Sequence, residues 1–521
     1  MKSKVSFLFI LLILAVFAVS ASAGAESEGG TLTIGLSVEP FTIDPAGGVY
    51  ISEALLIQQI YDPLIFSDPE GELYPGLATE WSANDDGTEY SLKLRDDVRF
   101  HDGTPFTAEA VKAALDRAKD GLTPIAASPA LLTTYAGTEI VDDTTVIVRF
   151  SETNATFLQD LSRAWLMIPA PTAGENEYIG TGPFVFESWA QQDSVTLRKN
   201  TAYNVAPEFM THSGPAYLDE IIFRFLPEQA TRAIALQTGE AQIVQDPSPV
   251  DALAMIDDPD YQVFTFAAPG VPAHQMINTE KFPTDDLNVR KAMNYAVDQD
   301  AIMEAGTMGL TPAAHGIITP TTWGYNADAD NLYPFDLEKA KSILEEAGWI
   351  DENGDGVREK DGRKLTIDYP ALPAYEEQFM ELLAYALQDA GFEVNLMTMD
   401  DAGISAAGGA GEHNILNMGW LSRDPSVLAY MFLSSNIEGG SAYSRFRSDR
   451  LDEILTLAPK TVDADERKAL YEEAQSIIME NALVIPIHAY SSLYIADTAV
   501  ENFTFDAEGY PIFYNVSLAA E

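Results

Sequence analysis

From residue 31 onwards, segments with an apolar residue at every second position alternate with segments whose apolar residues recur at helical spacing. Apolar side chains recur at every second position in Thr31–Leu36 and again within residues 90–100, which is typical of half-buried strands. Residues 288–298 and 336–347 instead carry apolar side chains at helical spacing, and Gly348 ends the second of these helices. The pattern therefore predicts short strands and amphipathic helices in alternation.

The same alternation extends to the C-terminal part of the chain without an internal repeat or a long low-complexity linker. It predicts an α/β fold. The further strands are expected at residues 146–150, 195–198, 223–226, 365–369, 393–397, 415–418 and 483–487, and the further helices at residues 52–61, 107–115, 231–238, 375–390 and 464–480.

The first residues have the pattern of a secretory signal. Lys2 and Lys4 precede an apolar run over residues 5–19, and small residues follow at 21–23. This order predicts export across the cytoplasmic membrane with cleavage after Ala23. An uncleaved membrane anchor is the alternative, although the run is somewhat short for a span of ~20 residues. We expect a periplasmic or cell-surface protein without a lipid anchor on cysteine, since the sequence contains none.

Length and charge narrow the classes of function. A chain of 521 residues exceeds what one hydrophobic core usually organises, so we expect at least two lobes. The 80 Asp and Glu residues outnumber the 30 Lys and Arg residues, which gives a net charge of −50 and excludes nucleic acid as a partner. The lack of cysteine excludes thiol nucleophiles, disulfides and cysteine-based zinc sites.

No catalytic motif stands out. The chain has no G-x-S-x-G nucleophile elbow, no H-E-x-x-H zinc helix and no phosphate-binding loop, and its six histidines include no pair at i, i+4 spacing. Residues 351–356 resemble the first half of a calcium loop, but Gly362 stands where a bidentate Glu is required, which favours a solvated turn. We expect a binding protein and not an enzyme, with an exported hydrolase as a remote alternative.

Several long segments point to a known family. They are YDPL at 61–64, YPGLATEW at 74–81, DG at 86–87, LRDDVRFHDGTPFTAEAV at 94–111, GTGPF at 180–184, VRKAMNYAVD at 289–298 and AGW at 347–349. In this order they resemble family 5 extracellular solute-binding proteins of peptide and nickel ABC importers, the nickel-binding branch more than the oligopeptide-binding branch. The resemblance spans about residue 30 to the C-terminus.

The resemblance implies a fold of the type II periplasmic-binding-protein class. It has two lobes joined by a hinge, an extra domain inserted in the first lobe, and a cleft that closes over the ligand. The chain is expected to cross between lobes near residues 277–283 and 486–490. The implied divisions are a signal peptide at 1–23, lobe I at 24–65, an inserted domain at 66–190, lobe I again at 191–280, lobe II at 281–487 and a return to lobe I at 488–521.

Two neighbouring charged residues bear on the ligand. In peptide-binding relatives, a G-W-x-x-D motif supplies an aspartate to the α-ammonium of the peptide. Here Arg423 stands at that position and Asp424 follows it, so the aspartate would serve only if the loop shifts by one residue. A cation at that place repels an ammonium group, and Arg423 therefore weakens the prediction of an ordinary peptide ligand.

A second arginine favours an anionic ligand. Arg163 lies in the apolar run 161–168, where a guanidinium needs an anionic partner. It matches the arginine that clamps chelator carboxylates in nickel-binding members, and a salt bridge to a carboxylate of the chain is the alternative. Trp420 and Tyr50 match aromatic pocket positions, with core packing as the alternative for Tyr50. The metal-binding His of those members has no counterpart near Ser441, so no metal ligand is assigned.

Together these observations predict the substrate-binding subunit of an ABC importer, a monomer that delivers its ligand to the membrane permease. The favoured ligand is a small anionic solute, with a nickel chelate as the candidate and no resident cofactor. A di- or oligopeptide ligand is the alternative within the same family. A receptor that reports its loaded state to a membrane sensor is a further alternative from another class.

Overall fold

The computed structural model describes residues 29–47, 51–69, 71–121, 134–174, 176–371 and 373–519. The predicted signal sequence, with Lys2, Lys4 and Ala23, and the predicted pocket residue Tyr50 lie outside these ranges. Within them, no helix has both the length and the apolar character needed to cross a membrane.

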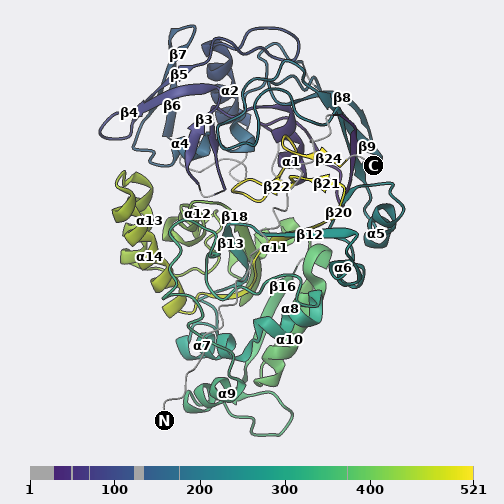
Figure 1. The fold of residues 1–521 in the computed structure, drawn as a ribbon. Coiled ribbons are helices and arrows are strands. Elements are labelled where there is room, and N and C mark those ends of the chain that lie inside the picture. Colours follow the sequence, from purple (N-terminus) through teal and green to yellow (C-terminus); the bar gives the residue numbers. More distant parts are fainter. Residues whose placement is uncertain are drawn as a thin grey trace, which may run out of the picture.

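A seven-stranded mixed sheet organises the first lobe (Figure 1). Its central strand β1 is parallel to both neighbours, and its alternation buries Leu32, Ile34 and Leu36. The outer pairs are antiparallel. In spatial order the sheet contains β12 (Tyr261–Ala267), β20 (Ser491–Asp497), β11 (Ile243–Gln245), β1 (Thr31–Leu36), β10 (Glu220–Phe225), β9 (Ser194–Lys199) and β8 (Phe184–Ala190).

A second, four-stranded antiparallel sheet lies at the top of the same lobe in Figure 1. Its inward side chains, among them Leu92 and Val148, share one continuous core with the first sheet. The predicted domain boundary at residue 190 falls at the end of β8, a strand of the seven-stranded sheet. The four strands are β4 (Ala78–Ala83), β5 (Glu89–Leu94), β7 (Thr145–Phe150) and β6 (Tyr135–Asp142), and helix α2 (Ala108–Gly121) contacts β6 and β7.

Short elements complete this part of the molecule, which we call lobe I (residues 29–267 and 491–519, within the described ranges). They are the helices α1 (Ile51–Ile60), α4 (Phe157–Asp160), η1 (Ala164–Leu166), α5 (Gln229–Gln237) and α6 (Pro249–Ile256), and the strand pairs β2 (Ile65–Ser67) with β3 (Leu73–Pro75), β21 (Val500–Glu501) with β24 (Ser517–Leu518), and β22 (Thr504–Phe505) with β23 (Pro511–Ile512).

Lobe II (residues 270–488) is built on smaller sheets covered by helices. Two apolar clusters form its core, one around Trp349 and Tyr369 and one around Phe432 and Ile478. Its strands are β13 (Gly270–Ile277), β18 (Ile415–Leu421) and β19 (Val484–His488) in one sheet, the parallel pair β16 (Thr366–Ala371) and β17 (Glu393–Thr398), and the pair β14 (Glu359–Lys360) and β15 (Arg363–Lys364).

The helices of lobe II mostly begin at a side-chain cap. Asp336, Asp400 and Asp463 each accept a backbone N–H of the first turn, which satisfies a donor that has no partner inside the helix. These helices are α7 (Leu287–Ala296), α8 (Gln299–Thr307), α9 (Leu337–Glu346), α10 (Pro373–Asp389), α11 (Asp401–Ala410), α12 (Val427–Phe432), η2 (Ser434–Asn436), α13 (Asp449–Leu457), η3 (Ala458–Lys460) and α14 (Ala464–Glu480).

Two neighbouring connections carry the chain between the lobes. Strand β12 belongs to the sheet of lobe I and the next strand, β13, to that of lobe II; β19 and β20 are divided in the same way. The first connection therefore lies between Ala267 and Gly270, earlier than the expected crossing at residues 277–283, while the second lies between His488 and Ser491. The predicted α/β fold is confirmed.

Candidate functional site

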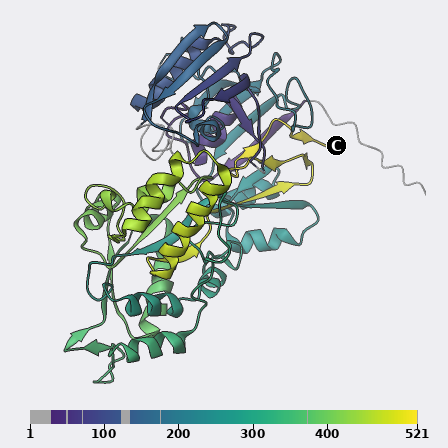
Figure 2. The same ribbon diagram turned by 90° about the vertical axis from the view of Figure 1, so that its left-hand side faces the viewer.

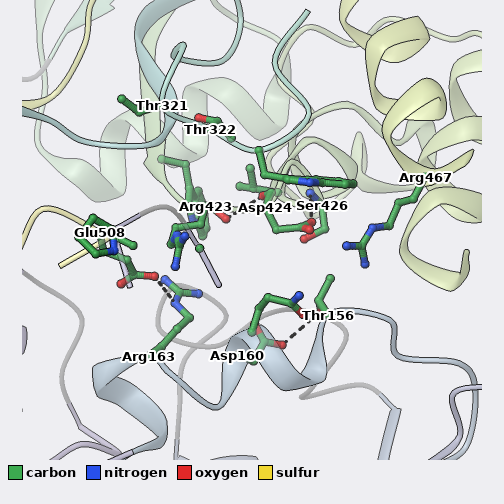
Figure 3. Close-up of a pocket in the computed structure, with 18 of the residues that line it drawn as sticks. Thr156, Asp160, Arg163, Thr321, Thr322, Arg423, Asp424, Ser426, Arg467 and Glu508 are labelled. Atoms are coloured by element: carbon green, nitrogen blue, oxygen red, sulfur yellow. Dashed lines mark hydrogen bonds and ion pairs between the residues drawn. The ribbon is translucent and has the colours of Figure 1, made fainter. Parts of the chain in front are cut away.

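A cavity of about 340 Å³ lies between the two lobes. Such a volume suits a small organic solute. Both lobes line it, and Figure 3 shows the side chains that face it. Lobe I contributes Pro69, Gly71, Glu72, Thr156, Gln159, Asp160, Arg163, Ala507 and Glu508, and lobe II contributes Thr321, Thr322, Trp323, Trp420, Ser422, Arg423, Asp424, Ser426, Val427, Tyr430 and Arg467.

The cavity brings together four of the five residues that the sequence nominated. Arg163 comes from lobe I, whereas Trp420, Arg423 and Asp424 come from lobe II. The fifth, Tyr50, lies outside the described residues.

Arg163 stands between α4 and η1 in a run that is otherwise packed into the core. Leu161 and Ile168 are fully buried, while the Arg163 side chain keeps 18% of its surface exposed and lines the cavity. Its Nε atom is 3.0 Å from Oε1 of Glu508. Burial lowers the pKa of Arg163, but the charges of Glu508 and Asp160 outweigh this, and the pKa is raised. The structure therefore contains the salt bridge that the sequence left as an alternative.

Glu508 reaches the cavity from the turn between β22 and β23. Asp506 organises this turn, because its Oδ1 accepts the backbone N–H groups of Glu508 and Tyr510, both at 2.8 Å. Gln58 donates to the other oxygen of Asp506 at 2.7 Å. Burial, followed by the charge of Glu508, raises the pKa of Asp506 to about 6. The backbone that carries Glu508 is thus held by a partly buried polar network.

Trp420, Arg423 and Asp424 follow from the end of β18. Gly270 of β13 pairs with this end at a φ of +128°, and a Cβ atom there would lie 2.2 Å from the Trp420 carbonyl oxygen, so only glycine fits. Asp424 turns the chain towards α12, since its Oδ1 accepts the N–H of Ser426 at 2.8 Å. These local bonds fix the loop that presents all three side chains to the cavity.

Arg423 reaches across the cavity to lobe I. Its Nη1 atom donates to Oγ of Ser67 at 2.8 Å. Gly71 gives the guanidinium room, because a Cβ there would lie 2.6 Å from Nη2. Within the described residues no carboxylate lies within 4.0 Å of this guanidinium.

Arg467 of α14 is a third arginine in the cavity, and the sequence analysis missed it. Its guanidinium carbon is 4.6 Å from the centroid of the Trp323 ring, and its Nη1 donates to the Ala155 carbonyl of lobe I at 3.1 Å. No described carboxylate forms an ion pair with it either. A signal existed, since Arg467 shares the helix face of the buried residues Tyr471, Ala474 and Ile478 at spacings of i+4, i+7 and i+11.

Aromatic side chains form the apolar part of the lobe II wall. Trp420 and Tyr430 meet edge to face, with ring centroids 5.1 Å apart, and Trp323 lies beneath Arg467. Flat aromatic surfaces of this kind contact the apolar part of a small ligand. Trp323, Tyr430, Asp160 and Glu508 join Arg467 as lining residues that the sequence did not nominate.

The lobes also touch beside the cavity. Lys460 of η3 forms an ion pair with Glu152 of lobe I, and the Ala155 N–H donates to the Pro459 carbonyl at 3.3 Å. Figure 2 shows the yellow-green helices α13 and α14 directly below the four-stranded sheet. With the bonds from Arg423 and Arg467, these contacts describe a closed arrangement of the lobes.

No group of three or more His, Asp or Glu side chains within the described ranges has the arrangement of a metal site. The turn at residues 351–356 holds itself together, since Asp351 accepts backbone N–H groups of Gly354 and Gly356 at 2.7 and 3.0 Å.

Comparison with known proteins places the chain among binding proteins. The model of the family described as "Bacterial extracellular solute-binding proteins, family 5 Middle" matches residues 72–440. Heme-binding protein A of Haemophilus influenzae is 28% identical over 498 residues, covering 88% of this chain and 87% of that protein. The dipeptide-binding protein of Escherichia coli is 28% identical over 499 residues, covering 88% and 89%.

A solved structure has the same fold. NikA from Brucella suis, solved in complex with Fe(III)-EDTA, superposes with a TM-score of 0.84 at 24% identity and covers 94% of this chain and 100% of its own. The predicted two-lobed fold is confirmed by this likeness.

Proposed function

Because the chain belongs to family 5 of the bacterial extracellular solute-binding proteins, we propose that it is the substrate-binding subunit of an ABC importer whose ligand is a small solute bearing at least one carboxylate. The solute occupies the cavity between the lobes, and the closed protein delivers it to the permease. Closure around the solute separates loaded from empty protein, which is what a transporter must distinguish.

The observation that carries this proposal is the pair of arginines on lobe II. In a chain with 80 acidic and 30 basic residues, Arg423 and Arg467 both line one cavity, and neither forms an ion pair with a described carboxylate. Guanidinium groups match carboxylates in charge and geometry. A charged hydrogen bond of this kind contributes about 1.5–3 kcal/mol.

Among carboxylate-bearing solutes, the sequence favours a metal chelate such as a nickel complex. In this case the chelator supplies the metal ligands, and the arginines hold its outer carboxylates. The aromatic wall formed by Trp420 and Tyr430 then contacts the apolar part of the chelator.

A short peptide is the second candidate, and one observation favours it. The carboxylate of Asp424 lines the cavity and accepts a backbone N–H, but no described Lys, Arg or His forms an ion pair with it. It is therefore open to an ammonium group. The name of the E. coli relative, a dipeptide-binding protein, agrees with this candidate.

The experiment is to identify what the protein retains. Native mass spectrometry of the purified protein gives the mass of any bound solute, and calorimetry then compares nickel with histidine, nickel with a tricarboxylate, and a dipeptide mixture. We expect a bound molecule with a carboxylate. A retained solute without any anionic group would contradict the proposal.

We propose further that the chain catalyses no reaction, acts as a monomer, and is exported with its signal removed after Ala23. Its relatives are binding proteins by name, and the family is extracellular. Mass spectrometry of the mature N-terminus and light scattering test the last two statements. An intact Met1 in the exported protein would contradict cleavage.

A further inference from the structure

We infer that Glu508 limits how much negative charge the ligand can carry, because its carboxylate forms an ion pair with the guanidinium of Arg163. This inference rests on the proposed function, in which arginines of the cavity hold ligand carboxylates. It assigns to Glu508 the role of a specificity-determining residue that competes with the ligand.

Arg163 and Glu508 form an ion pair, but the pair does not have the geometry of a good hydrogen bond. Nε of Arg163 and Oε1 of Glu508 are 3.0 Å apart, yet both atoms are buried without a hydrogen bond of good geometry. The Arg163 side chain keeps 18% of its surface exposed and lines the cavity. Figure 3 shows this pair on the lobe I side, with Arg423 of lobe II facing it.

The backbone of Glu508 is fixed while its carboxylate faces the cavity. Asp506 and Gln58 hold the turn, so the backbone keeps the Glu508 side chain within reach of Arg163. The side chain of Glu508 is 12% exposed. A ligand carboxylate approaching Arg163 therefore meets a negative charge already in place.

The charges on the two walls of the cavity determine where an anionic ligand can bind. Among the lining residues that the structure describes, lobe I has three carboxylates, Glu72, Asp160 and Glu508, beside the guanidinium of Arg163. Lobe II has the guanidiniums of Arg423 and Arg467 beside Asp424. The wild-type cavity thus offers lobe II arginines to an anion, and lobe I repels a second or third anionic group. Without the charge of Glu508, Arg163 becomes a third anion-binding group.

The test replaces Glu508 and compares probes of different charge. Glu508→Gln keeps the shape and removes the charge, and Glu508→Ala removes both. Calorimetry measures citrate, with three carboxylates, and benzoate, with one carboxylate and an aromatic ring, at pH 7.5 and constant ionic strength. Glu473→Gln is the matched control, because Glu473 is also paired with an arginine, at 2.6 Å, but lies outside the cavity.

We expect both Glu508 variants to bind citrate at least tenfold more tightly than the wild type, with benzoate changed less than threefold. A short-range charge interaction at an effective dielectric constant of about 20 is worth several times the thermal energy, which supports this size of effect. Glu473→Gln should change neither probe.

Equal weakening of both probes would show that Glu508 only orients Arg163, and would overturn the inference. An unchanged preference for citrate over benzoate would overturn it too, as would failure of every probe to bind the Glu508 variants. The proposed function fails separately, if the solute retained by the wild-type protein has no anionic group.

Discussion

The two walls of the cavity hold their arginines in different ways. On lobe I, Arg163 lies beside Glu508 at 3.0 Å, so its charge is balanced inside the protein. On lobe II, Arg423 and Arg467 donate instead to a hydroxyl and a carbonyl of the opposite lobe. A neutral acceptor leaves the charge of a guanidinium uncompensated. The comparison teaches that the lobe II arginines join the lobes and keep their charge available, as the proposed function requires, whereas the charge of Arg163 is paired with Glu508.

The largest expected effect comes from Arg467. Arg467→Gln removes a ligand contact and also the donor to Ala155, so we expect about a 100-fold loss of affinity for the retained solute, or ~2.7 kcal/mol. Calorimetry measures this loss. Arg450→Gln is the control, because Arg450 is exposed and paired with Glu473 outside the cavity. Affinity within threefold of the wild type would remove Arg467 from the binding site.

The next largest effect is expected in how the stability of the protein depends on pH, through Asp506 of lobe I. The folded-state pKa of Asp506, about 6, is raised above its ordinary value of 3.8, so the folded protein binds more protons than the unfolded chain between these values. Stability should therefore fall as the pH rises from about 4 to 6. Asp506→Asn should remove on the order of 2 kcal/mol of this fall.

Urea unfolding of both proteins at pH 4.5 and pH 7 checks this expectation. Asp368→Asn in lobe II is the contrasting control, because hydrogen bonds and the charge of Lys281 more than offset burial and lower the pKa of Asp368. Its contribution is lost only below its ordinary value of 3.8, so Asp368→Asn should leave the difference in stability between pH 4.5 and pH 7 as in the wild type. An Asp506→Asn protein with the full wild-type pH dependence would contradict the account.

A smaller effect is expected at the aromatic wall. Trp420→Ala removes a flat apolar surface that meets Tyr430, and we expect about a tenfold loss of affinity whatever the charge of the solute. Trp420→Phe should recover most of it. A loss confined to highly charged solutes would contradict an apolar role for Trp420.

The smallest effect is expected at the rim of the cavity, where Lys460 and Glu152 join the two lobes beside it. Lys460→Gln breaks the exposed ion pair with Glu152, which is worth less than ~1 kcal/mol, so affinity should change less than threefold. Titrations at two salt concentrations measure it. A larger loss than that of Arg467→Gln would place the closing contacts at the rim and not in the cavity.

The sequence predicted the elements well where local spacing decides them. The helix expected at residues 464–480 is α14, with the same bounds. In contrast, α11 (Asp401–Ala410) carries Gly403, Gly408 and Gly409, and its helical spacing is too weak to recognise. Helix formation there depends on a cap at Asp400 and a left-handed end at Gly411.

The site was partly predictable for a similar reason. Arg163 stood out because a guanidinium in an apolar run needs a partner, but that partner, Glu508, comes from a distant turn that no local pattern connects to it. Arg467 was hidden among charged neighbours in the first turns of α14, although its helical face is buried. Pairings across lobes are set by the tertiary fold.

The claim that solute binding depends on the arginines of lobe II is tested most directly by the double variant Arg423→Gln/Arg467→Gln. Calorimetry with the solute that the wild-type protein retains should show no measurable binding, while the Arg450→Gln control binds as the wild type does. Retention of wild-type affinity by a folded double variant would contradict the account.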